Sequence, residues 1–145
     1  PISFSMRKDL IKLRIPGERF WARPLSDNTA EIMNILVDPE YGLNDIVAHD
    51  GENVTCVLVK KTETAALSYE ADVSNEEREV ILARVRKIID HFQAKDVQVE
   101  PAVLCKMLIA IPVGMPREFV VDLARTCPVK VELIFPEASE EEYDE

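Results

Sequence analysis

The spacing of apolar residues changes near residue 63, and this change restricts the folds that the chain can adopt. Between residues 10 and 63, apolar and polar side chains alternate in short runs, such as LIKLRI at 10–15 and RFWARPL at 19–25. Alternation at every second residue is typical of strands that bury one face. Five short runs of this kind, separated by tight turns, predict an all-β half built as a small, partly open barrel or as a sandwich.

The turn-forming residues between the runs place the individual strands. Strands are expected at residues 10–15, 19–25, 29–37, 45–48 and 54–63. The segment DPEYGLND at 38–45 is rich in turn formers and is expected to be a loop, and His49, Asp50 and Gly51 are expected to form a turn. In the last strand, alternation predicts that Val54, Cys56 and Leu58 share one face.

The second half of the chain combines helical and strand patterns. SNEE at 74–77 predicts a capping box, with Ser74 as N-cap and Glu77 reaching back, ahead of a helix that ends near Lys95. The apolar residues of that helix recur at helical spacing: Ile81, Val85, Ile88, Ile89 and Phe92. A second helix is expected to begin at Pro116. It would place on one face Phe119, Val120, Leu123 and Ala124.

Strands are expected around these helices, at 64–73, 97–100, 105–113 and 129–135. The resulting order is strand, helix, strand, strand, helix, strand, which is typical of a ferredoxin-like fold with two helices on one face of an antiparallel sheet. The expected fold class is therefore α+β. The expected organisation is an N-terminal arm at 1–9, a small all-β subdomain at 10–63, a ferredoxin-like subdomain at 64–136 and an acidic, disordered tail at 137–145.

The negative charge of the chain is concentrated in the tail. The net charge is −10, and six carboxylates lie beyond Pro136: Glu137, Glu140, Glu141, Glu142, Asp144 and Glu145. Removing these six charges leaves −4 for the rest of the chain, which is too little for a protein that imitates DNA. The tail either serves solubility or acts as an acidic arm that docks on a basic partner, with Tyr143 as an apolar anchor.

The cysteines and the hydropathy pattern favour a cytosolic protein. Cys56, Cys105 and Cys127 form no C-x-x-C pair, their number is odd, and each is flanked by apolar residues, so buried and reduced thiols are expected. No apolar run approaches the ~20 residues that a bilayer requires, and the first residues lack the pattern of a secretion signal.

Motifs for catalysis are missing, so we expect no enzymatic activity, no cofactor and no metal. The four glycines are too far apart for a phosphate-binding loop, and the sequence contains neither G-x-S-x-G nor H-E-x-x-H. Asp45 and His49 have the spacing of a metal or acid–base pair, but a turn explains them better, and His91 is expected to be structural near a helix end.

Nucleic-acid binding is also not expected. Lys and Arg total 17 against 27 Asp and Glu, and RVRK at 84–87 is most simply the solvated side of a helix.

Two features remain as candidates for binding a partner. The first is the stripe formed by Arg19, Trp21 and Arg23, which share one face if the segment is a strand. Trp and Arg are enriched at interface hot spots, which favours a binding surface. A lone Trp in a small domain is more often a core residue covered by arginine stems, and this is the preferred interpretation. The second feature is the tail, with Glu140, Glu141, Glu142 and Tyr143; Tyr41 is a further candidate.

Several segments resemble an uncharacterised bacterial family, domain of unknown function 4265. The similar segments are IPGERFWARPL, MNILVDPEYGLNDIV and LIAIPVGMP, and together they extend over most of residues 11–135. The family's characteristic positions would be filled here by Gly17, Glu18, Trp21, Asn34, Gly42, Leu43, Asp45, Val47 and Pro112. The resemblance implies a bacterial or phage origin and a two-part architecture, and it brings no known activity.

Taken together, these patterns predict a small cytosolic protein that binds another protein without catalysis. One form of this hypothesis is an immunity protein that neutralises a toxin, and another is a phage inhibitor of a bacterial defence system. Either would act by covering the surface of a partner that is expected to be basic. The alternative is a small-ligand sensor or regulatory domain that dimerises through its sheet.

Overall fold

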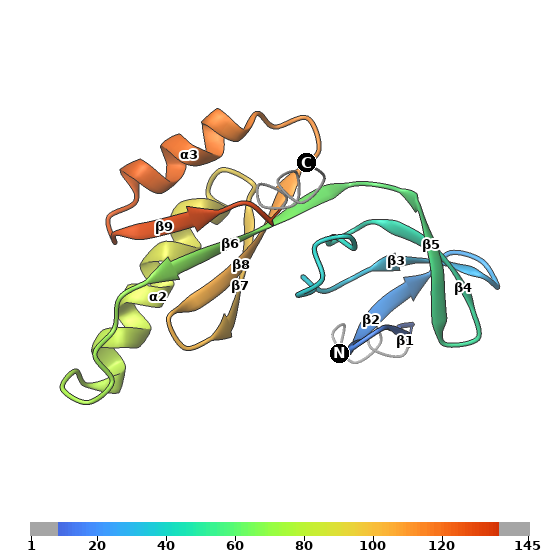
Figure 1. Cartoon of the computed structure of the whole chain (residues 1–145), viewed down its shortest axis with the longest axis horizontal. Coiled ribbons are helices and arrows are strands. Elements are labelled where there is room, and N and C mark those ends of the chain that lie inside the picture. The colour runs from blue at the N-terminus through green and yellow to red at the C-terminus, as the bar shows by residue number, and fades with distance from the viewer. Residues whose placement is uncertain (1–8, 137–145) are drawn as a thin grey trace, which may run out of the picture. The chain divides into compact units, whose positions relative to one another are not determined.

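The computed structural model describes residues 9–136, which belong to two compact units that divide between Glu63 and Thr64. The N-terminal unit is a closed barrel of five strands, and the C-terminal unit is a four-stranded sheet with two helices (Figure 1). The chain is therefore of the α+β class. The expected N-terminal arm, apart from Asp9, and the expected acidic tail lie outside the described residues.

The barrel strands follow one another around the barrel in chain order. They are β1 (Ile11–Ile15), β2 (Glu18–Pro24), β3 (Thr29–Ile32), β4 (Ile46–Asp50) and β5 (Asn53–Val59). Neighbouring strands are antiparallel, and the barrel closes where β1 pairs with β5 in parallel at Arg14 and Asn53. The tight turn between β1 and β2 contains Gly17 at φ +87°, a conformation that glycine adopts without strain.

The barrel core comes from the alternation that the sequence displays. Every second residue of β1 and β2 points inward, so Leu13, Ile15, Phe20 and Ala22 are buried. The core is completed by residues of β3, of the loop that joins β3 to β4, and of β4: Ala30, Ile32, Leu36 and Val47. Burying a side chain the size of Phe20 contributes about 1.5–3 kcal/mol, so these positions decide which face of each strand is internal.

Strand β5 departs from the expected alternation. Its register against β4 shifts twice, which leaves Thr55 and Leu58 as extra residues opposite the β4 strand. Each bulge moves the following side chain to the other face. Val54 and Val57 therefore pack against the core, whereas Cys56 is exposed and Leu58 is 52% exposed. The expectation that Val54, Cys56 and Leu58 share a face was wrong for this reason.

The third strand is shorter than expected. It ends at Ile32, and residues 33–45 form a long loop instead of continuing the strand to residue 37. Side chains of neighbouring elements hold this loop to the barrel: the Glu18 carboxylate accepts hydrogen bonds from the backbone N–H groups of Val37 (2.8 Å) and Asp38 (3.1 Å). The loop also buries Ile35 and Leu36, which explains its apolar sequence.

The C-terminal unit places two helices against one sheet. Its elements are β6 (Thr62–Tyr69), α2 (Arg78–Gln93), β7 (Gln98–Val103), β8 (Lys106–Pro112), α3 (Arg117–Thr126) and β9 (Val131–Ile134). The strands lie in the order β7-β8-β6-β9 (Figure 1). Both helices contribute to one core: Ile88 and Phe92 of α2 and Val120 and Leu123 of α3 pack with the inward residues of the sheet.

Three local expectations for this unit were wrong. Helix α2 begins at Arg78, and Ser74 is not its N-cap, because Asp72 and Glu76 bond each other in a separate turn before the helix. Phe119 is 40% exposed instead of belonging to the buried face of α3. Strand β7 continues through Pro101, which the order of strands allows because β7 is at the sheet edge and one side of its backbone needs no partner.

Candidate binding surface

The outward face of the β1–β2 hairpin gathers four cations around the single tryptophan. In the register of the hairpin Lys12 lies opposite Trp21, and Arg14 lies opposite Arg19. Since the alternate residues of both strands fill the core, these side chains and Arg23 point away from the barrel and are exposed. We call the set Lys12, Arg14, Arg19, Trp21 and Arg23 the cationic hairpin face.

Trp21 is a surface residue, so the expectation that it belongs to the core was wrong. Its side chain is 36% exposed, because Phe20 and Ala22 occupy the inward positions of β2. The Lys12 ammonium lies over the indole ring, 4.4 Å from its centroid, in a cation–π contact. The backbone is held as well, since the Trp21 N–H donates to Asn34 Oδ1 at 2.7 Å. The ring is thus exposed on a rigid strand.

Two carboxylates partly neutralise the cationic hairpin face. One oxygen of Glu52, Oε1, lies 3.2 Å from Arg14 Nη2 and 3.6 Å from Arg19 Nη2, and Glu31 pairs with Arg23 across the β2–β3 ladder. Four positive and two negative charges leave a local excess of +2 in a chain whose net charge is −10. The three paired arginines are each more than half exposed, so each pair stabilises the fold by about 1 kcal/mol at most.

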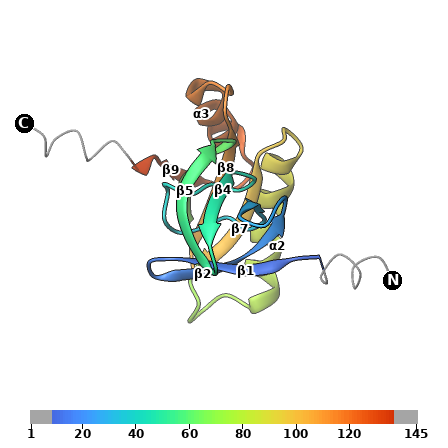
Figure 2. The same ribbon diagram turned by 90° about the vertical axis from the view of Figure 1, so that its right-hand side faces the viewer.

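Closure of the barrel brings Glu52 to this face. Glu52 lies in the β4–β5 turn, which meets the β1–β2 hairpin where the Arg14 N–H donates to the Glu52 carbonyl at 2.7 Å (Figure 2). Sequence reasoning missed Lys12 and Arg14, although the hairpin turn at Pro16–Gly17 and simple alternation would have found both. Glu52 lies 38 residues from Arg14, so no local pattern could have indicated it.

Tyr41 does not join this face through any bond. Its ring is half buried against the barrel core, and its N–H donates to the Asp38 carbonyl at 3.2 Å. Burial raises the pKa of the Tyr41 phenol, and the nearby carboxylates of Glu40 and Asp38 raise it further. Among residues 9–136, no hydrogen bond or ion pair joins Tyr41 to the cationic hairpin face. The other predicted partner-binding residues, Glu140, Glu141, Glu142 and Tyr143, lie outside the described residues.

Asp45 organises the loop beside the barrel through the hydrogen bonds of its carboxylate. Its carboxylate is fully buried and accepts hydrogen bonds from the N–H groups of Gly42 (2.8 Å), Lys61 (2.7 Å) and Thr62 (3.2 Å), and from Lys60 Nζ (2.8 Å). A buried carboxylate needs this number of donors to offset its lost hydration. The Asp45 carboxylate therefore ties loop 33–45 to residues 60–62.

Each histidine contacts a backbone carbonyl, but His49 does not form the expected turn. His49 belongs to β4, is 9% exposed, and places Nδ1 3.0 Å from the Gly51 carbonyl. His91 joins the two helices, because its Nε2 lies 2.8 Å from the Leu123 carbonyl of α3. Within residues 9–136, no group of three or more His, Cys, Asp or Glu residues could hold a metal ion.

The cysteines are less buried than expected. Cys56 is exposed on β5, and Cys105 and Cys127 are half buried; all three are free thiols. Burial raises the pKa of the Cys127 thiol, which lowers its reactivity. The expectation of buried thiols was therefore wrong, most clearly for Cys56, because the β5 bulges turn it outward.

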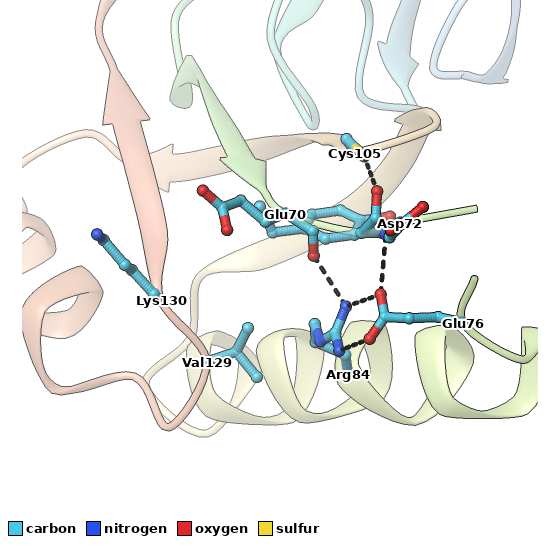
Figure 3. Close-up of a pocket in the computed structure, with 9 residues that line it drawn as sticks. Glu70, Asp72, Glu76, Arg84, Cys105, Val129 and Lys130 are labelled. Carbon is cyan, nitrogen blue, oxygen red and sulfur yellow. Dashed lines mark hydrogen bonds and ion pairs between the residues drawn. The ribbon is translucent and has the colours of Figure 1, made fainter. Parts of the chain in front are cut away.

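The C-terminal unit has an open polar pocket of about 900 Å³ (Figure 3). Arg84 crosses it and donates to both oxygens of Glu76, at 3.1 and 2.6 Å, and to the Glu70 carbonyl at 2.8 Å. The hydrogen bonds from Arg84, followed by that from the Asp72 N–H, lower the pKa of Glu76 to about 2. Arg84 was expected on the solvated side of the helix, but it anchors the segment that precedes α2.

A second hollow in this unit is mainly apolar, with a volume of about 480 Å³. It lies between the start of α2 and the β7–β8 hairpin. Several of its lining residues are unusually exposed for their type, among them Leu82 (48%), Val103 (66%) and Leu104 (55%).

Comparisons with known proteins give no indication of the function. No model of a known protein family, no curated protein and no solved structure matches the chain. Among the described residues, no helix has the length and apolar character needed to cross a membrane.

Proposed function

We propose that this protein is a non-catalytic binding protein that inhibits another protein by covering part of its surface. The observation that carries the proposal is the exposed Trp21 on a rigid strand, flanked on its own face by Arg19 and Arg23. Trp and Arg are enriched among the few residues that supply most of the binding energy of a protein interface, and an aromatic ring on a fixed strand loses little entropy when it is covered. The barrel core is filled without this ring, since Phe20 and Ala22 occupy the inward positions of β2.

The proposed setting is that of an immunity protein for a toxin or of a phage inhibitor of a bacterial defence system. The net charge of −10 supports a partner that is basic as a whole, since long-range attraction would raise the association rate. The acidic segment after Pro136 would contribute to that attraction. A cytosolic location is part of the same proposal, and the three unpaired thiols support it.

The proposal is tested by comparing two truncations of exposed apolar residues in the same unit. Trp21→Ala removes the central ring of the cationic hairpin face, whereas Leu25→Ala removes a 45% exposed side chain just beyond β2. Each full-length variant captures partners from cells of the source organism, and the partner retained by the wild type is then purified and titrated. We expect both variants to melt like the wild type, and Trp21→Ala alone to lose about 10-fold or more in affinity. Equal affinities of the two variants would contradict the proposal.

The alternative function is a small-ligand sensor that dimerises through its sheet, and the apolar hollow at α2 is the observation that favours it. A volume of about 480 Å³ lies within the range of small-molecule sites. A sensor would be stabilised against heat by a metabolite, and Leu82→Arg would abolish that stabilisation without affecting capture of a protein partner.

We also propose a ferredoxin-like topology for the C-terminal unit and a distant relationship to the uncharacterised bacterial family that the sequence resembles. The strand order β7-β8-β6-β9, with a helix after β6 and after β8, supports the topology. The relationship is supported by the similar residues Glu18, Asn34 and Asp45, because each fixes loop 33–45: Glu18 and Asn34 join it to β2, and Asp45 joins it to Lys61 and Thr62.

A further inference from the structure

We propose that the cationic hairpin face binds carboxylate side chains of the partner protein, and that Glu52 occupies this carboxylate site until the partner displaces it. The inference rests on the proposed function and names the chemistry of the partner at this surface. A partner that is basic as a whole would then present one or two acidic side chains to Arg14 and Arg19.

The geometry of Glu52 is that of an internal counter-ion. A single oxygen, Oε1, faces both Arg14 (3.2 Å) and Arg19 (3.6 Å). The carboxylate and both guanidinium groups are more than half exposed, at 54%, 54% and 58%. Each guanidinium carries five N–H donors in a planar fork, so one shared oxygen leaves most of the donors unused. A carboxylate that approached from outside could bond either fork with two oxygens.

Glu31 provides the contrast within the same face. Its side chain is only 18% exposed, pairs with Arg23, and accepts a second hydrogen bond from Asn44 Nδ2 at 2.9 Å. No such second bond fixes the Glu52 side chain among the described residues. Displacement of Glu52 is therefore much easier than displacement of Glu31, and Arg14 and Arg19 form the open part of the face.

A protein carboxylate suits this face better than a nucleic acid does. Duplex DNA carries one negative charge per about 1.7 Å of its axis, and a local excess of +2 within a chain of net charge −10 would be repelled by such a polyanion. Single strands are held by bases stacked on aromatic rings, but Lys12 covers one face of Trp21. An isolated carboxylate can bind the two arginines, and an apolar side chain next to it can pack on the remaining ring surface. Such a ligand avoids the repulsion of a polyanion and does not need both faces of the ring.

The test uses Trp21 as its own reporter, because it is the only tryptophan of the chain. Full-length protein is titrated with a synthetic ten-residue acidic peptide that has blocked ends and carries two Glu side chains beside a Leu, and the fluorescence of Trp21 is followed at low and at physiological ionic strength. The matched probes are the same peptide with both Glu residues replaced by Gln, and a trithymidylate, whose two phosphates carry the same charge as the two Glu side chains. Variants Glu52→Gln and Arg19→Gln are compared with Glu40→Gln and Lys61→Gln, which change the same charges at exposed positions away from this face.

We expect the acidic peptide to bind and its amide form not to bind. Glu52→Gln should tighten binding about 2- to 5-fold relative to Glu40→Gln, and Arg19→Gln should weaken it relative to Lys61→Gln, as expected for exposed ion pairs. Equal effects of the paired variants, or tighter binding of the oligonucleotide than of the peptide, would overturn the inference. If the captured partner depends on Trp21 but is indifferent to Glu52 and Arg19, the inference fails while the proposed function stands.

Discussion

Replacing Asp45 by Asn should lower the free energy of unfolding of the barrel by much more than the loss of one exposed charge would. The Asp45 carboxylate is fully buried and accepts four hydrogen bonds, two at each oxygen. Asn keeps one accepting oxygen, but its amide NH₂ must then face two donors at the other position. If the oxygen stays toward Lys61 and Thr62, the Gly42 N–H loses its acceptor, and Lys60 Nζ keeps only the Glu40 carbonyl, at 3.1 Å.

The expected size follows from those two lost bonds. A hydrogen bond to a charged group contributes about 1.5–3 kcal/mol, and the Gly42 N–H that loses one is buried, whereas the Lys60 side chain is 40% exposed and regains hydration. We therefore expect a loss of about 3–5 kcal/mol, which is a large part of the ~5–15 kcal/mol by which domains are stable. Lys60→Met should cost less, about 1–2 kcal/mol, because it leaves Asp45 its three backbone donors.

Urea unfolding followed at Trp21 measures this loss in the barrel, while far-ultraviolet circular dichroism follows the helices of the C-terminal unit. With an m-value of about 1–2 kcal/mol per molar urea, the Asp45→Asn midpoint should fall by about 2 M or more. Asp50→Asn is the matched control, because Asp50 is an exposed residue in the same part of the chain and should shift the midpoint little. Equal midpoints for the two variants would show that Asp45 does not hold the loop in place.

Three other predictions concern single sites. Gly42→Ala should destabilise the barrel by about 1–3 kcal/mol, because a Cβ there would lie 2.5 Å from Thr62 Oγ1 and 2.6 Å from the Thr62 carbonyl oxygen; an unchanged Tm would contradict the close approach. Glu76→Gln should lower the Tm of the C-terminal unit at neutral pH, and the difference from the wild type should shrink as the pH falls from about 4.5 to about 2, since a lowered pKa stabilises the folded state only while Glu76 is ionised. A difference that does not change with pH would rule out the ion pair with Arg84 as its source. Thiol labelling of the folded protein should modify Cys56 first and Cys127 much more slowly, as mass spectrometry of the peptides will show; the opposite order would mean that the β5 bulges are not as described.

The spacing of apolar residues was sufficient to predict a helix or strand wherever one buried face fixes the position of that element. The alternation around Leu13 and Phe20 predicted β1 and β2, and the apolar spacing around Ile88 predicted the long helix. The same alternation also placed Arg19, Trp21 and Arg23 together on one face of β2. Whether that face was internal depended on which neighbours filled the barrel, and a general preference for buried tryptophan gave the wrong answer.

The features that sequence reasoning missed depend on distant contacts. The bulges at Thr55 and Leu58 belong to the pairing of β5 with β4, and they exchange the faces of β5 without leaving any local signal in the sequence. Closure also carries Glu52 to Arg14, and loop 33–45 stays on the barrel because Asp45 reaches Lys60 and Thr62. The N-terminus of α2 was misplaced by a few residues, because Asp72 and Glu76 form the capping-like pair that the sequence suggested for Ser74 and Glu77.

Fluorine NMR of protein labelled with fluorotryptophan can decide whether the β1–β2 hairpin is where the partner binds. The label enters at Trp21 alone, so the free protein should give one resonance that responds to solvent, as the exposed ring requires. On addition of the purified partner, the resonance should shift and lose its response to solvent as the ring is covered. A complex that forms while this resonance keeps its position and its response would show that the partner binds elsewhere.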